Sequence, residues 1–407
     1  MWLRRLLLLG LLPNAFLVDA AVLPPIEPMP TVAAAMLAPA DLLNGTGYTI
    51  DASAPVAGYM GQFVLRAPAG TFNADGTEML AIRVSELASI ARLGQLSQTG
   101  MFADALAASA LKTGAAIGQA VTNPVETISG IPAGVGRFFQ SAATTFERAT
   151  QNNGGGTSAG GSAENAAMDA LGVNAAKRRI AKQAGADPYT TNPVLAKQLD
   201  DLAKAAVAGG VSLDVALAVS TAGVATAISA TATVSNLVWD KSPADIRTLH
   251  EEKLAAMGVA TDTVRAFVTN RWFTPTLSVP LVEALAQMPD ATNRAGVVAW
   301  AGGVRSESEA RFVRNAVGMA RRAGTERDPV VALEIAGRIL VVHTRGGRIV
   351  VPAPVDYVVW TGPVRAFAER REPGGTRRGI HVTGLASARA REGLRDTGWT
   401  LEELSRR

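Results

Sequence analysis

The sequence predicts a mainly α-helical protein with Ala- and Gly-rich helix packing, a small N-terminal β hairpin and a C-terminal α+β module. Apolar residues recur at helical spacing through most of residues 163–325, which is typical of packed amphipathic helices. Short β-prone runs bounded by turn residues lie near the two ends of the chain. With 407 residues, the chain is long enough for two or three domains with cores of their own.

Residues 1–20 have the pattern of a secretory signal peptide. Trp2–Arg5 form a short basic start, Leu6–Val18 are apolar, and Val18–Ala20 place short side chains near a cleavable bond. The apolar part has 13 residues, whereas a membrane-spanning helix needs about 20. We therefore expect a mature chain that begins near Ala21 and works in the periplasm or on the periplasmic face of an envelope membrane.

Residues 21–47 are expected to form an extended tether, because four prolines lie between Ala21 and Pro30. Cysteine is absent from the chain. This absence excludes disulfides, thiol catalysis, thiolate metal sites and a lipid attached through cysteine. An exported protein of this size without disulfides fits a bacterial envelope better than an animal extracellular space.

Residues 48–150 are predicted to hold the β hairpin followed by helices. The β-prone runs are 48–50, 62–65 and 71–72, and Ala54–Pro55 between them has the character of a turn. From Glu78 onward the apolar spacing becomes helical. The helices expected in this region cover residues 78–98, 101–122 and 132–150.

Residues 151–162 are glycine-rich and are expected to form a linker to a helical domain over 163–325. The helices expected there cover 163–184, 194–208, 212–239, 243–257, 262–269, 275–287 and 306–323. Asp187–Pro193 is rich in oxygen atoms that could ligate a cation. A helix boundary explains it better, because Gly185 can end one helix while Asn192 and Pro193 begin the next.

Residues 326–407 are expected to form a basic α+β module. Arg345–Arg348 predict a hairpin turn in which glycine supplies a positive φ. Residues 303–407 contain 19 Arg and 12 acidic residues, a net charge of +7, against −3 for the rest of the chain. Such an excess suits either a solvated helical surface or a binder of an anionic polymer. Nucleic acid is not the expected partner, because the chain is expected to be exported.

No catalytic set, cofactor motif or metal-ligand spacing is recognisable in the sequence. His250, His343 and His381 lie on different expected elements, and no two of them have the spacing of zinc ligands. His250 is expected on a solvated helix face. A periplasmic hydrolase remains an alternative if His343 and His381 meet in the C-terminal module beside Asp356 or Glu334.

Two further segments bear on partners. Val215–Trp239 has 25 residues and no charge, so it suits either a buried Ala-rich helix or a membrane-associated one whose small residues permit self-association. Asn270–Pro275 contains Arg271, Trp272 and Phe273, and it suits either a core anchor or a binding edge. The leading hypothesis is an exported envelope protein of structural or interaction type, with a protein or membrane partner.

Overall fold

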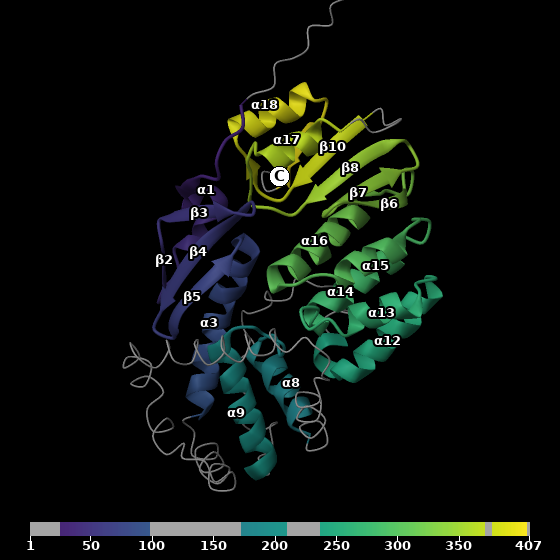
Figure 1. Ribbon diagram of the computed structural model, residues 1–407. Helices are drawn as coiled ribbons and strands as arrows, with labels where there is room; N and C mark the ends of the chain where they lie inside the picture. Colours follow the sequence, from purple (N-terminus) through teal and green to yellow (C-terminus); the bar gives the residue numbers. More distant parts are fainter. Residues whose placement is uncertain (1–24, 98–171, 210–236, 371–376, 405–407) are drawn as a thin grey trace, which may run out of the picture.

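The computed structural model describes residues 25–97, 172–209, 237–370 and 377–404. Helices take 51% and strands 21% of this part of the chain, with sheets of five, five and two strands. The expectation of a mainly helical fold with a small hairpin is therefore wrong. Both five-stranded sheets are principal parts of the molecule, one near each end of the chain (Figure 1).

The N-terminal sheet has the order β1-β3-β4-β2, with β5 also paired to β4, and all its pairings are antiparallel. Its strands are β1 (Thr31–Ala33), β2 (Thr49–Ile50), β3 (Ser53–Ala57), β4 (Met60–Ala67) and β5 (Gly70–Asp75). Ala54–Pro55, expected to be a turn, lies inside β3, where Pro55 is opposite Thr31 of β1. Residues 21–47, expected to be a tether, supply β1 and the short helices α1 (Ala34–Leu37) and α2 (Ala40–Leu43).

One core joins the N-terminal sheet to three helices, α3 (Thr77–Ser97), α8 (Val173–Ala184) and α9 (Pro193–Gly209). The alternating strand residues Phe63 and Leu65 point into it, as do Leu80 and Leu93 of α3. The helices expected over 78–98, 163–184 and 194–208 are present here, although α8 is described only from Val173. The expected helices over 101–122 and 132–150 and the linker over 151–162 lie outside the described residues.

The second core is helical and covers one face of the C-terminal sheet. Its helices are α12 (Pro243–Ala256), α13 (Thr261–Val268), α14 (Pro275–Ala286), α15 (Arg294–Gly302) and α16 (Glu307–Ala323). In the sequence Ser242 stands before Pro243 with Asp245 three residues on, which is the spacing of a capping box, and the two residues form that box at the start of α12. α15 was not expected. Of Val215–Trp239, only residues 237–239 are described, and Val238 among them is fully buried.

The C-terminal sheet has the order β12-β10-β8-β7-β6, in which β8, β10 and β12 are parallel and β7 is antiparallel to both neighbours. Its strands are β6 (Val330–Ala336), β7 (Ile339–Thr344), β8 (Arg348–Ala353), β10 (Arg377–Val382) and β12 (Thr400–Glu403). The expected hairpin between β7 and β8 is confirmed, with Gly347 at φ 78°. β12 was not expected.

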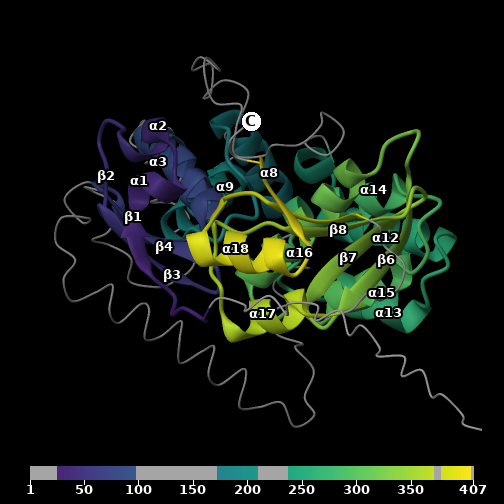
Figure 2. The ribbon, with the colours of Figure 1, turned by 90° about the horizontal axis from the view of Figure 1, so that it is seen from above.

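Side chains alternate between the two faces of this sheet, which makes the C-terminal part a three-layer sandwich. Leu340 and Val342 join the helical core, whereas Val341 faces α17 (Gly362–Ala368) and α18 (Ala388–Asp396) on the opposite side. A two-stranded sheet of β9 (Tyr357–Val358) and β11 (Leu385–Ala386) lies beside it. In Figure 2 the N-terminal sheet and the helices α12–α15 lie on opposite sides, with α18 between them.

Candidate functional site

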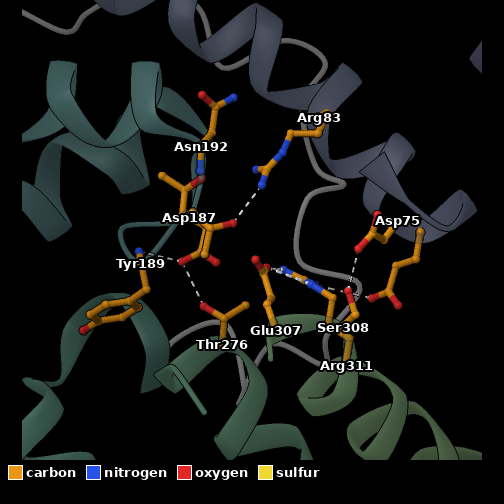
Figure 3. Close-up of polar contacts among 12 residues, drawn as sticks. Asp75, Arg83, Asp187, Tyr189, Asn192, Thr276, Glu307, Ser308 and Arg311 are labelled. Atoms are coloured by element: carbon orange, nitrogen blue, oxygen red, sulfur yellow. Dashed lines mark hydrogen bonds and ion pairs between the residues drawn. The ribbon is translucent and has the colours of Figure 1, made fainter. Parts of the chain in front are cut away.

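A small cleft lies where three distant parts of the chain meet. We call it the junction cleft. It has a volume of about 130 Å³. The loop between α8 and α9, the start of α14 with the residues before it, and the first turns of α16 form its walls (Figure 3). The lining residues are Asp187, Tyr189, Thr191, Arg271, Trp272, Thr274, Leu277, Glu307 and Arg311.

Asp187 is the carboxyl group of this cleft. Its Oδ1 accepts hydrogen bonds from the Tyr189 backbone N–H and the Thr276 hydroxyl, both at 2.8 Å. Burial raises the pKa of Asp187, and these two hydrogen bonds and the Arg311 charge only partly oppose that effect. The carboxyl is thus held in one orientation in a place that disfavours its ionised form.

The loop that carries Asp187 is fixed by the helix ends on either side. Gly185 ends α8 with φ 68°, and the Asn192 side chain accepts the Val194 backbone N–H at the start of α9. The helix-boundary interpretation of Asp187–Pro193 is therefore confirmed. It is incomplete, since Asp187, Tyr189 and Thr191 of the same heptapeptide line the junction cleft.

A buried polar network anchors this loop from behind. Glu86 of α3 pairs with Arg83 at 2.8 Å, and it also accepts hydrogen bonds from Asn192 and Thr190. Arg83 donates in turn to the Thr191 hydroxyl at 2.7 Å. Because every member is paired, the network holds the cleft wall against α3 at little electrostatic cost.

α16 contributes Glu307 and Arg311, one turn apart. The Arg311 Nε and Nη2 both donate to Glu307 Oε1, at 3.0 and 2.7 Å. Arg311 Nη1 also lies 3.7 Å from Glu78 Oε1, and Arg314 and Asn315 donate to Glu78. Burial alone would raise the pKa of Glu78, but the two arginines and Asn315 lower it overall. The Arg311 charge is therefore already matched by carboxylates.

The aromatic wall comes from the segment before α14. Asn270 anchors this segment by donating to the carbonyls of Gly302 and Val304, both at 3.0 Å. Phe273 packs in the core against Phe267, while the Arg271 guanidinium lies 4.4 Å from the Trp272 ring centre at the cleft. The core-anchor interpretation of Asn270–Pro275 is therefore confirmed for Phe273, whereas the binding edge stays a prediction.

The two candidate catalytic histidines do not meet, although His343 does contact one of the candidate acids. His343 of β7 contacts Glu334 at 3.3 Å, and His381 of β10 contacts Glu402 of β12 at 3.0 Å. β8 lies between the strands that carry the two histidines, and His381 is three residues along β10 from the position level with His343. Asp356 faces the N-terminal sheet, accepting the backbone N–H groups of Gly61 at 2.9 Å and Thr77 at 3.0 Å.

His250 is buried, not solvated as expected. Its Nε2 lies 3.0 Å from the Ser278 hydroxyl, and 6% of the residue surface is exposed. Burial, helped by nearby Lys253, lowers its pKa from 6.5 to about 4. Ile246, His250 and Leu254 recur at intervals of four, so the sequence did carry a signal for this burial.

About half of the described arginines from residue 303 onward form ion pairs with acidic side chains. Arg391 pairs with Glu403, Arg345 with Asp290 and Arg348 with Asp328, and five further arginines from residue 303 onward form ion pairs within the described residues. Interspersed pairs of this kind fit a solvated surface better than one continuous basic face.

Glu307, Arg311 and Thr276 were not candidates in the sequence, because an acid–base pair at i and i+4 is the ordinary pattern of an exposed helix. In the described parts of the chain, no group of three or more His, Cys, Asp or Glu side chains is placed to hold a metal ion. Nor is any described helix both long and apolar enough to span a bilayer.

No protein-family model matches this chain, and no curated protein or solved structure matches it either.

Proposed function

We propose that this protein is an exported component of a bacterial cell envelope that acts by binding a protein or membrane partner. The observation that carries the proposal is the start of the chain, with its basic Trp2–Arg5, apolar Leu6–Val18 and short residues up to Ala20. The absence of cysteine fits the same compartment, since the fold depends on packing and not on disulfides.

Residues just beyond the expected cleavage bond after Ala20 already belong to the described fold. Glu27 lies only a short way beyond that bond. Its backbone N–H donates to the Trp360 carbonyl at 3.0 Å, and its carboxylate accepts the Trp360 N–H at 2.9 Å and the Ser387 hydroxyl.

Polar residues hold distant parts of the chain together in the described fold. Asp356 joins the C-terminal part to the N-terminal sheet, Glu78 joins α3 to α16, and Glu86 joins α3 to the α8–α9 loop. These contacts make one assembly of segments that are distant in sequence. The uncharged stretch Val215–Trp239, with its small residues, adds a sequence that suits helix association in or beside a membrane.

Fractionation of a bacterial host with a periplasm tests this proposal. The full chain, tagged at its C-terminus, is expected in the envelope fractions with Ala21 as its first residue. Osmotic shock followed by carbonate extraction then separates a freely released protein from a membrane-held one. A matched pair of variants makes the test specific: Leu8→Arg with Leu9→Arg should block export, whereas Leu8→Ile with Leu9→Ile should not.

Recovery of the wild type in the cytosol with Met1 and Trp2 intact would overturn the proposal. Equal export of both variant pairs would also count against it, because the apolar stretch would then have no role.

A further inference from the structure

The junction cleft has the size of a site for a small metabolite. Its volume of about 130 Å³ is well above the ~10–15 Å³ that a single water molecule needs. Its walls come from three parts of the chain that other contacts hold in place, namely the Glu86 network, the Asn270 anchor and the Arg311–Glu307 pair. A cleft whose walls are fixed in this way is largely preformed for a ligand.

One pole of the cleft is acidic. Asp187 Oδ1 is occupied by the Tyr189 N–H and the Thr276 hydroxyl, whereas Oδ2 makes no hydrogen bond within the described residues. Asp187 lines the cleft and is oriented through one oxygen, so the other remains able to accept from a ligand. Such a group accepts well from a cationic N–H donor, because charge-assisted hydrogen bonds are about twice as strong as neutral ones.

The other pole is basic. Stacking on Trp272 fixes the plane of the Arg271 guanidinium. A guanidinium carries five N–H donors and can serve several acceptors at once, a carboxylate among them. Arg311, which also lines the cleft, is held against Glu307 and Glu78 as part of its wall.

We propose that the junction cleft binds a small α-amino acid as its zwitterion, with the ammonium group on Asp187 and the carboxylate on Arg271. A ligand with both charges satisfies both poles, whereas a ligand with a single charge would meet one pole of its own sign. Leu277 offers an apolar surface to the side chain, and Thr191 and Thr274 add hydroxyl groups. This binding role is independent of the proposed export.

Isothermal titration of the full mature chain with glycine, L-alanine, D-alanine and L-serine tests the proposal. Two analogues of alanine serve as matched controls: alaninamide keeps only the positive charge, and N-acetylalanine keeps only the negative one. At least one of the four amino acids should bind, and the corresponding analogues should bind at least about tenfold more weakly.

Variants locate the site. Asp187→Asn keeps an oxygen for Tyr189 and Thr276 but removes the charge, and Arg271→Met keeps an apolar side chain of similar length. Each should weaken binding at least about tenfold, while Asp262→Asn and Arg265→Met, an exposed pair on α13, should leave it unchanged. Thermal melting of each unliganded variant checks that it is folded.

Three results would overturn the proposal. They are the absence of binding by all four amino acids at millimolar concentration, binding of alaninamide or N-acetylalanine as tight as that of alanine, and unchanged affinity in Asp187→Asn.

Discussion

The carboxylate of Asp356 accepts the backbone N–H of Gly61 at 2.9 Å, across 295 residues of sequence. The same carboxylate accepts the Thr77 N–H, which is the first of α3. An acidic group at this position also interacts favourably with the helix dipole. The residue that the sequence suggested as part of a hydrolase site thus connects the C-terminal part to the N-terminal sheet.

Replacing Asp356 by Ala should lower the free energy of unfolding by about 2–4 kcal/mol, because one buried and one partly buried N–H group lose their acceptor. Asp356→Asn should cost less than half as much. It keeps an oxygen that can accept both groups, and burial, which raises the pKa of Asp356, already disfavours the charge. Urea denaturation measures both values. Exposed Glu326→Ala is the control and should stay within about 0.5 kcal/mol. Equal losses in the two Asp356 variants would contradict the assigned role.

His250 should make stability fall as the pH drops from 6.5 to 4. Folding lowers its pKa to about 4, so the unfolded chain binds more protons in this window. The stability that depends on neutral His250 is fully present above pH 6.5, and about 3 kcal/mol of the free energy of unfolding is lost by pH 4. Urea denaturation at a series of pH values measures this slope. His250→Gln should flatten this slope. Ser278→Ala should lower stability by about 1 kcal/mol at every pH and leave the slope unchanged. An unchanged slope in His250→Gln would refute the prediction.

Asp187→Asn should stabilise the unliganded protein by about 1 kcal/mol at pH 7. Folding raises the pKa of Asp187, so its favourable contribution is complete below the unfolded pKa and is lost as the pH rises through the folded one. The gain from the variant should therefore shrink as the pH falls towards 4. Thermal melting without ligand at both pH values measures it. A loss of stability in Asp187→Asn at pH 7 would show that the ionised Asp187 carboxylate stabilises the fold, and would contradict the prediction.

Glu78→Gln should destabilise the contact between α3 and α16 by about 1–3 kcal/mol at pH 7. Removing one partner of a buried ion pair is costly, and we discount that cost because 35% of the Glu78 side chain is exposed. The Arg314 and Arg311 charges hold the pKa of Glu78 below its usual range. The difference in unfolding free energy between the wild type and Glu78→Gln should therefore narrow as the pH falls through this lowered pKa. Glu369→Gln, in an exposed pair with Arg365, is the matched control and should cost under about 0.5 kcal/mol. Equal losses of unfolding free energy in Glu78→Gln and Glu369→Gln, measured by urea denaturation, would exclude a special role for Glu78.

Local signals in the sequence predicted local structure well. The apolar spacing from Glu78, the Gly185 helix end, the Ser242 cap and the Gly347 turn depend on near neighbours, and each is present in the structure. The fold class failed because strand pairing depends on distant partners. β1 is opposite β3, which contains Pro55, and polar β12 becomes a strand only by pairing with β10.

The junction cleft was beyond sequence reasoning for a similar reason. Asp187, Arg271 and Arg311 come from three segments that the fold brings together, and each has an ordinary local explanation as a loop acid, a residue beside a core anchor or half of a helix ion pair. His250 is different. The apolar residues four positions before and after it could have predicted its burial, but the charged run that follows it suggested a solvent-facing helix.

The attachment of Glu27 to Ser387 spans 360 residues. A ribosome or a translocation channel delivers the chain in order, so this contact cannot form until almost the entire polypeptide has emerged. The earliest residues of the folded protein must therefore wait for the latest ones. The first core uses only residues between Ala34 and Ala206, so it can form before Glu27 reaches its final contact with Ser387.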